Sequence, residues 1–248
     1  MLLAVDIGNT NIVSALFDGE RIISPFRIQS DADSIMQSYS DELSDYLSGF
    51  SVDRAVISSV VPCLTGRIRD ALSSALGLEP LIVSKDLETG LRKASIPDEL
   101  GSDLICNLAY AHAIVPDRTA MVVDFGTALT MTAVNGRGEV LGASIAPGLI
   151  TAMNSLFGET AQLPRVSLEV PRSAFGRNSE DAIRSGIMLG YAGLVSSMIE
   201  RCEKEAGEAF HVIATGGLSS VIASLIPRFD SVDMNHTLKG LRLIADLN

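Results

Sequence analysis

The stretch LLAVDIGNTNIVSALFDG, residues 2–19, joins two apolar strands through a turn that begins at an acid, Asp6. The stretch MVVDFGTALTMTAVNGRG, residues 121–138, repeats this order around Asp124, close to half the chain further on. In both, an apolar strand ends in Asp-x-Gly, a polar turn follows, and an alternating strand runs to a Gly-containing turn. Such turns between alternating strands predict β-hairpins. The repeat indicates an internal duplication.

The segments after each hairpin support this interpretation. Third strands are expected at 21–28 and 139–148, and mixed helices and strands follow in both halves. The further expected elements are a helix at 34–47, strands at 54–61 and 80–84, a long helix at 179–206, a strand at 210–217 and closing helices. Chance similarity of two hairpins is the alternative, but the shared third strand favours duplication. With a boundary in the Pro-containing loop at 113–119, we expect two α/β halves, residues 1–115 and 116–248, and a cleft between them.

The composition is that of an ordinary globular protein, with 47% apolar and 20% charged residues among 248. A net charge of −11 argues against general binding to nucleic acid or to an anionic membrane, because both attract a basic surface. The three cysteines form no CxxC pair, so we expect reduced thiols and a cytoplasmic protein. The apolar run at 185–199 is too short and too rich in glycine and serine to span a bilayer, and it predicts a buried helix.

The two acidic turns carry the groups that a phosphate site needs. A carboxylate at a strand end, beside turn amides, can hold a hydrated Mg²⁺ while amides and hydroxyls bind phosphate oxygens. Gly8 and Gly126 let the backbone approach a ligand closely, because they lack a Cβ atom. Thr10, Asn11 and Thr127 add short hydrogen-bond donors. In a duplicated fold we expect the two turns to face each other across the cleft.

Other phosphate-binding and catalytic motifs are missing. The sequence lacks a G-x-x-x-x-G-K-[ST] P-loop, and no G-x-G-x-x-G follows a strand and opens a helix. Residues 124–126 spell DFG, but without a glycine-rich loop and an HRD stretch this match to protein kinases is coincidental. His112, His211 and His236 are isolated among apolar neighbours, and we interpret them as structural.

Several short motifs occur in a fixed order along almost the whole chain. They are DIGNTN, ISSVVP, ELGSDLICN, VDFGTALT, SIAPGL, TAQLPRV, FGRNSEDAIRSGIMLGYAGLV, ATGGL and HTLKGLRLI. DIGNTN alone is moderately specific, whereas the ordered set is highly specific, and through this set the chain resembles the type III pantothenate kinases. That family belongs to the actin/Hsp70/sugar-kinase superfamily. The resemblance implies an α/β fold of duplicated actin-like (ribonuclease H-like) ATPase halves with a central nucleotide cleft.

The resemblance also implies which residues bind ATP and cations. Asp6 matches the acid that organises Mg²⁺, and Asp124 matches the acid associated with a monovalent cation, K⁺ or NH₄⁺. The residues that match ATP-binding positions are Asp6, Ile7, Gly8, Asn9, Thr10, Asn11, Ile12, Val13, Thr127, Gly216 and Gly217. Solvated acids at strand ends are the simpler alternative for Asp6 and Asp124, and their paired context argues against it.

On the acceptor side, Asp103 matches the general base that takes a proton from the pantothenate hydroxyl as this oxygen attacks the γ-phosphorus of ATP. The residues that match acceptor-binding positions are Gly101, Ser102, Asp103, Leu104 and Ser179. In the family, the residue at the position of Ser179 reaches pantothenate from the neighbouring subunit of a homodimer. The reaction is the first step of coenzyme A synthesis. From the residues alone, Asp103 also suits the first turn of a helix, and Ser179 also suits the position after an N-cap at Asn178.

Two departures from the family pattern lie on the acceptor side. The family usually has Gly-x-Asp-Arg where this chain has Gly-Ser-Asp-Leu, so no guanidinium stands at Leu104. The tyrosine that the family places a few residues before Pro97 is missing as well. Arg92, Lys93 and Arg177 are candidate sources of the lost positive charge. Two alternatives therefore stay open: a kinase for another small hydroxylated acceptor, and a nucleotide-binding regulatory protein with little turnover.

Overall fold

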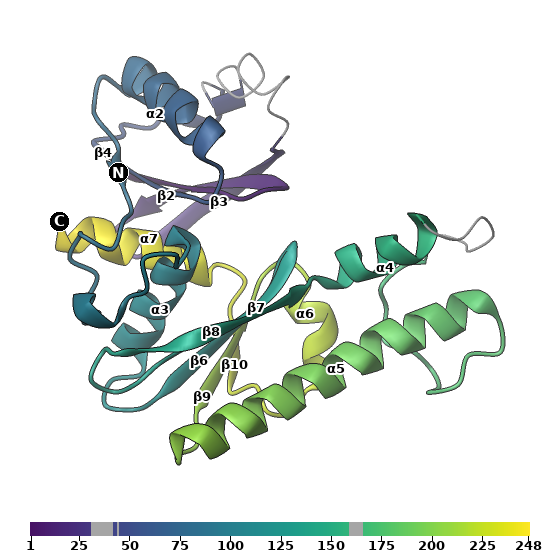
Figure 1. Ribbon diagram of the computed structural model, residues 1–248. Helices are drawn as coiled ribbons and strands as arrows, with labels where there is room; N and C mark the ends of the chain where they lie inside the picture. Colours follow the sequence, from purple (N-terminus) through teal and green to yellow (C-terminus); the bar gives the residue numbers. More distant parts are fainter. Residues whose placement is uncertain (31–41, 44, 159–165) are drawn as a thin grey trace. The chain divides into compact units, whose positions relative to one another are not determined.

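The computed structural model describes residues 1–30, 42–43, 45–158 and 166–248. The chain divides into two compact units, of which one combines Met1–Tyr110 with His236–Asn248 and the other is Ala111–Asn235. Each unit is built around one five-stranded sheet with helices packed against it (Figure 1).

The sheet of the first unit has the strand order β3-β2-β1-β4-β5. Its strands are β1 (Leu2–Ile7), β2 (Asn11–Asp18), β3 (Arg21–Gln29), β4 (Arg54–Ser59) and β5 (Leu81–Ile82). β1 pairs antiparallel with β2 and parallel with β4, so it lies in the centre of the sheet. Leu3, Val5 and Ile7 of β1 are wholly buried in the core, as expected for a strand covered on both faces.

The helices described in this unit complete its layers. They are α2 (Pro62–Leu76), the 3₁₀ turn η1 (Lys93–Ser95), α3 (Ser102–Ile114), whose last residues belong to the second unit, and α7 (His236–Leu247). α2 begins at a proline, whose missing N–H would have had no partner there. It ends at Gly77, which takes the left-handed conformation with φ of 67°. The C-terminal helix α7 packs on β1 and β4 through buried Leu238, Leu241 and Ile244.

The second unit has the strand order β10-β9-β6-β7-β8. Its strands are β6 (Ala120–Phe125), β7 (Ala128–Val134), β8 (Val140–Pro147), β9 (His211–Thr215) and β10 (Ser231–Val232). Its described helical segments are α4 (Leu149–Gly158), α5 (Ser179–Ala206), α6 (Ser219–Ile222) and the 3₁₀ turn η2 (Ala223–Leu225). β6 takes the central place, antiparallel to β7 and parallel to β9.

The predicted duplication is confirmed strand by strand. In both units an antiparallel meander of three strands is extended on its other side by two parallel strands. β1 and β6 have the same order of buried positions, and in each the acid, Asp6 or Asp124, is the one residue that is partly exposed. The hairpin turns differ in detail. Gly19 has positive φ in the first turn, and Gly138 has positive φ in the second.

One expectation about organisation has a different outcome, and a second is largely untested. The sequence assigned residues 236–248 to the second half, but α7 belongs to the first unit because its apolar side covers β1 and β4. The helix expected at 34–47 lies mostly outside the described residues.

The expected long helix is confirmed as α5. Gly207 follows its last residue and takes the left-handed backbone conformation, with φ of 74°. Only one stripe of α5 is buried, formed by Ser185, Met188, Ala192, Val195 and Ile199 at helical spacing. α5 is long enough and apolar enough to cross a membrane, but core helices of soluble proteins share this length and composition. Less than half of the most apolar stretch of α5 is buried within the chain. The expectation of a buried helix is therefore confirmed for this one stripe alone.

Candidate active site

The first acidic turn connects β1 to β2 and is held in shape by Ser30. The Gly8 N–H donates to the carbonyl of Asn11 at 3.0 Å. The Ser30 hydroxyl donates to the carbonyl of Gly8 at 2.6 Å, and the Ser30 N–H donates to the carbonyl of Thr10 at 2.8 Å. Sequence reasoning did not identify Ser30, because a single serine after a strand gives no signal of this contact. The turn is therefore a defined loop rather than a loose one.

The residues expected to bind ATP in this turn divide into two groups. Asn9 and Thr10 are exposed, and Asp6, Gly8, Asn11 and Val13 are partly exposed. Ile7 and Ile12 are wholly buried and belong to the hydrophobic core of the unit. Those two residues therefore offer a ligand only their main-chain atoms, while the exposed turn offers amides and hydroxyls.

The second acidic turn connects β6 to β7 and is braced by the start of α4. The Gly148 N–H and the Thr151 hydroxyl both donate to the carbonyl of Thr127, at 3.0 Å and 2.8 Å. A Cβ atom at Gly148 would lie 2.3 Å from the carbonyl oxygen of Gly126, so this close packing requires glycine. Gly148 falls in the motif SIAPGL, whose role sequence reasoning left unassigned. Gly126 and Thr127 themselves are exposed at the tip of the turn.

Gly216 lies against the Asp124 carboxylate in the same unit. It follows β9, which pairs with β6 so that Asp124 is opposite Thr215. Gly216 has φ of 89°, and a Cβ atom there would lie 2.4 Å from Oδ1 of Asp124. The structure thus brings together four residues that the sequence singled out separately, namely Asp124, Gly126, Thr127 and Gly216. Gly217 is exposed beside them.

Asp103 lies in the first turn of α3, in the same unit as Asp6. The N–H of Leu104 donates to its Oδ1 at 2.8 Å. A Cβ atom at Gly101 would lie 2.5 Å from the same oxygen, so the glycine leaves room for the carboxylate. Burial raises the pKa of the Asp103 carboxyl above its usual value, and the hydrogen bond from Leu104 offsets part of this increase.

Cys106 connects Asp103 electrostatically with Asp6. This thiol is wholly buried one turn further along α3. Burial raises its pKa well above the usual value, and the negative charges of Asp6 and Asp103 raise it further. The thiol therefore stays neutral, and its raised pKa reflects burial first and the two negative charges second.

The other acceptor-side residues have structural contacts. The Ser102 hydroxyl is 3.0 Å from Oγ of Ser58, accepts from the N–H of Ser59 at 2.8 Å and donates to its carbonyl at 3.0 Å. Leu104, at the position of the family arginine, is buried. Contacts from Ser102 or Leu104 to an acceptor would therefore come mainly from the main chain. The hydroxyl of Ser102 instead fixes the start of α3 to the end of β4.

Ser179 is the first residue of α5 and is exposed. Asn178 is the N-cap, since its side chain accepts from the N–H of Asp181 at 2.8 Å. Arg184 pairs with Glu180 and Asp181 at 2.6 Å and 3.0 Å. The expected N-cap is confirmed, and Ser179 remains open to solvent within its own unit.

The donor sets suit hydrated cations rather than a closed metal site. Among the described residues, no three His, Cys, Asp or Glu side chains gather to hold a metal ion. Asp6 and Asp124 each stand at a strand end beside turn amides and hydroxyls. Mg²⁺ in phosphate sites usually has one or two carboxylates, several waters and the phosphate oxygens as ligands, so Asp6 fits this role.

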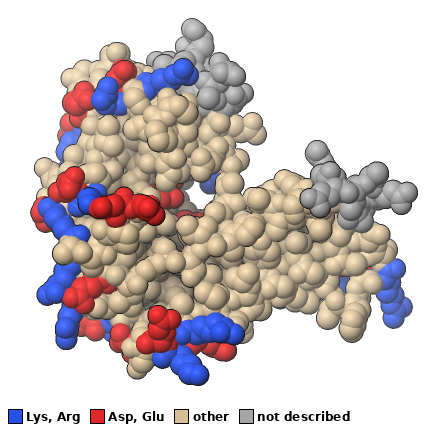
Figure 2. Space-filling model, viewed as in Figure 1, with Lys and Arg blue, Asp and Glu red and all other residues tan. Residues whose placement is uncertain are grey.

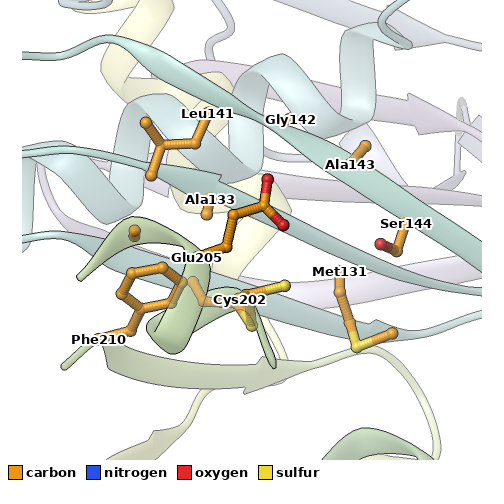
Figure 3. A pocket seen from close by; sticks show the side chains of 11 residues that line it. Met131, Ala133, Leu141, Gly142, Ala143, Ser144, Cys202, Glu205 and Phe210 are labelled. Atoms are coloured by element: carbon orange, nitrogen blue, oxygen red, sulfur yellow. The ribbon is translucent and has the colours of Figure 1, made fainter. Parts of the chain in front are cut away.

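A cavity of about 330 Å³ in the second unit lies away from all of these residues. It is lined by β6, β7, β8 and the C-terminal end of α5, and Glu205 is the one charged side chain among its lining residues (Figure 3). None of the residues that the sequence singled out lines it. The cavity therefore does not contribute to the candidate active site.

Solved structures with the same arrangement define the class of the fold. A Campylobacter jejuni protein described as a Baf family transcriptional activator superimposes with a TM-score of 0.62 at 20% identity, over 98% of this chain and 97% of that one. The activator of the 2-hydroxyisocaproyl-CoA dehydratase from Clostridium difficile, solved with bound ADPNP, gives 0.58 at 17% identity, over 99% and 92%. The protein thus has the duplicated α/β fold of the actin-like ATPases and sugar kinases.

Sequence comparison then identifies the family. The sequence pattern of the type III pantothenate kinases matches residues 2–201. The type III pantothenate kinase of Geobacter sulfurreducens is 38% identical over 255 aligned residues, which cover all of this chain and 99% of that protein. The chain belongs to the type III pantothenate kinase family.

The raised pKa of Asp103 predicts how stability depends on pH. A carboxyl whose pKa is raised by folding holds its proton more tightly in the folded state. The contribution of this carboxyl to the free energy of unfolding is therefore lost as pH rises from its unfolded pKa of about 3.9 through its raised folded pKa. We expect Asp103→Asn to gain stability relative to the wild type over this window, as measured by urea unfolding at a series of pH values between 4 and 8.

Asp98 supplies a control of opposite sign. Its carboxylate pairs with Lys85, and this ion pair lowers the pKa of Asp98. Asp98→Asn should therefore lose a small amount of stability above the unfolded pKa and recover it as pH falls. A stability difference for Asp103→Asn that does not change with pH would contradict the assigned burial of this carboxyl.

Proposed function

We propose that the protein transfers the γ-phosphoryl group of ATP to the primary hydroxyl of pantothenate, giving 4′-phosphopantothenate and ADP. Family membership over the whole chain supports this activity, which is the first step of coenzyme A synthesis. The structural observation that carries the proposal is the placement of the Asp103 carboxylate. It lies in the first turn of α3, in the same unit as Asp6, and the N–H of Leu104 donates to it at 2.8 Å.

The reaction needs alignment and charge neutralisation more than covalent catalysis, because its transition state is loose. The acceptor oxygen attacks the γ-phosphorus, the bond from that phosphorus to the β–γ bridging oxygen breaks, and ADP leaves. Asp103 takes the hydroxyl proton as the new bond forms. A raised pKa makes this carboxylate a better base than an exposed aspartate, since base strength increases with pKa.

The two acidic turns hold the donor in this proposal. The exposed amides and hydroxyls of Asn9, Thr10 and Thr127 bind phosphate oxygens, and Gly216 and Gly217 line the adenosine side. Asp6 holds Mg²⁺, which neutralises charge on the phosphates when bound. Asp124 supports a monovalent cation, K⁺ or NH₄⁺. Its carboxylate beside glycine main chain supports this assignment.

Fewer of the family's residues are retained at the acceptor site than at the ATP site. Leu104 is buried where the family has arginine, yet its N–H still supports the Asp103 carboxylate. The substitution therefore removes a positive charge and leaves the base in place. This favours a kinase over a regulatory protein without turnover, because a binding protein has no need of the base. Another small hydroxylated acid is the second candidate acceptor.

We also propose a homodimer, in which Ser179 reaches the acceptor bound by the partner. Gly186, Gly190 and Gly193 are exposed on α5, and a Cβ atom at each would meet no other atom within 4 Å. At about 100° per residue they lie roughly opposite the buried stripe. Figure 2 shows an uncharged surface over the middle of the visible side of α5, with acidic and basic residues gathered towards its C-terminal end. A face of small residues without charge suits close packing against a second copy.

The proposed location of this ATP-dependent step is the cytoplasm.

Asp103→Asn should bind ATP normally and lose turnover by roughly 10²- to 10⁴-fold, because a positioned base is removed while the donor site is kept. A coupled assay of ADP release measures turnover, and calorimetry measures ATP binding. The wild type is tested with pantothenate and with a panel of other hydroxylated acids. If ADP is released with another acid alone, that acid is the acceptor in place of pantothenate. If no acid gives ADP release, the regulatory alternative stands.

The dimer is tested by sedimentation velocity. Gly190→Gln should shift the wild-type dimer towards monomer, because a long side chain enters the packed face. It should also reduce pantothenate phosphorylation, since Ser179 no longer reaches its partner. Gly66→Gln in α2, where a Cβ atom also meets nothing within 4 Å, is the matched control. A wild type that sediments as a monomer at micromolar concentration would contradict the proposal.

A further inference from the structure

The C-terminal helix α7 contacts α3 one helical turn beyond Asp103. A Cβ atom at Gly240 of α7 would lie 2.2 Å from the carbonyl oxygen of Cys106 and 2.7 Å from its carbonyl carbon. These are main-chain atoms, which cannot move aside as the end of a flexible side chain can. The two helices therefore touch backbone to backbone, and the distance between them depends on the absence of a side chain at this position.

A second contact follows at Asn107, the next residue of α3. The Thr237 hydroxyl donates to Oδ1 of Asn107 at 2.8 Å, and Nε2 of His236 lies 3.0 Å from the Asn107 carbonyl oxygen. Asn107 and His236 are wholly buried. The His236 ring also meets the Tyr110 ring edge-on, with 5.0 Å between centroids. Hydrogen bonds have narrow geometric limits, so this contact fixes the rotation of α3 as well as its depth.

α7 is in turn tied to the sheet that carries Asp6. It packs on β1 and β4. The guanidinium of Arg54, the first residue of β4, donates to the carbonyl of Ala245 at 3.1 Å and pairs with Asp246 at 2.8 Å. At the start of α3, the Ser102 hydroxyl is hydrogen-bonded to Ser59 at the end of β4. The segment of α3 that bears Asp103 is thus held at two levels, by β4 in its first turn and by α7 in its second.

We propose that Gly240 and Thr237 of α7 are positioning residues for the phosphoryl transfer: through Cys106 and Asn107 they set the depth and rotation of α3, and thereby the place of the Asp103 carboxylate. The proposal rests on the role of Asp103 as the base. A displacement of about 1 Å at a reacting group can reduce a rate by roughly 10²-fold, so a contact remote from the substrate can matter this much. A residue that only stabilised the fold would lower the melting temperature and leave turnover of the folded enzyme unchanged.

Gly240→Ala places a methyl group against the main chain of Cys106. At a temperature where the variant is fully folded, we expect kcat with pantothenate to fall about 10- to 100-fold, because α3 must move. The KM for ATP should change little, since the β1–β2 turn is not displaced. Gly66→Ala, in a helix of the same unit with open space around the new methyl group, is the matched control and should keep the wild-type kcat.

A pair of substitutions at Thr237 separates the hydrogen bond from the packing. Thr237→Val keeps the shape and removes the donor to Asn107, so kcat should fall. Thr237→Ser restores the hydroxyl and should recover most of the wild-type kcat. Equal kcat for the valine and serine variants, or an unchanged kcat in folded Gly240→Ala, would overturn the proposal.

A measurement without turnover distinguishes this proposal from the proposed function. The N–H of Leu104 donates to the Asp103 carboxylate, so its amide resonance reports the position of that group. We expect Gly240→Ala and Thr237→Val to shift the Leu104 resonance in ¹⁵N-labelled protein, whereas Gly66→Ala and Thr237→Ser leave it in place. If the wild type phosphorylates no acceptor but the resonance shifts, the proposed function fails while the positioning contact stands. An unshifted resonance overturns the positioning proposal itself.

Discussion

A central strand that ends at an acid, followed by a glycine-containing turn that neighbouring segments hold in one conformation, is the constraint on which the rest of the structure depends. β1 and β6 are bonded to neighbours on both sides, so neither Asp6 nor Asp124 can shift along its strand. Beside Asp124 the backbone approaches so closely that only glycine fits at Gly216, and Gly148 is enclosed in the same way against the second turn. The exposed amides of these turns are therefore presented in a fixed shape, which is what a triphosphate site requires.

The proposed role of Asp103 as the base comes at a cost to stability. Asp103 could have stood in solvent at the start of α3, where an acid also favours a helix. Instead it is partly enclosed, and burial makes its ionisation less favourable. Gly101, the N–H of Leu104 and the anchored Ser102 hold the carboxylate in place, and no described Lys, Arg or His forms an ion pair with it. Functional sites often combine such locally unfavourable choices with strong support from neighbouring elements.

Much of the fold could be predicted from the sequence because its signals are local. Alternating strands around glycine turns identified both meanders, and the helical pattern at 179–206 identified α5, for which the Asn178 cap was also expected. The contacts that could not be predicted join distant segments. α7 was assigned by chain order to the second half, since nothing local shows that its apolar side covers β1. For the same reason the sequence did not reveal the contact of Ser30 with the first turn, or that Ser102 and Leu104, on either side of Asp103, are buried.

The proposed function requires that both acidic turns contact one nucleotide, and calorimetric titration with MgATP tests this requirement most directly. The account predicts one nucleotide per chain. Thr10→Ala and Thr127→Ala, one from each turn, should each weaken binding on the order of 10-fold or more, because each removes a hydrogen bond to a charged phosphate. If one of the two substitutions leaves the affinity unchanged while the other abolishes binding, the turns do not share a ligand and the account is contradicted.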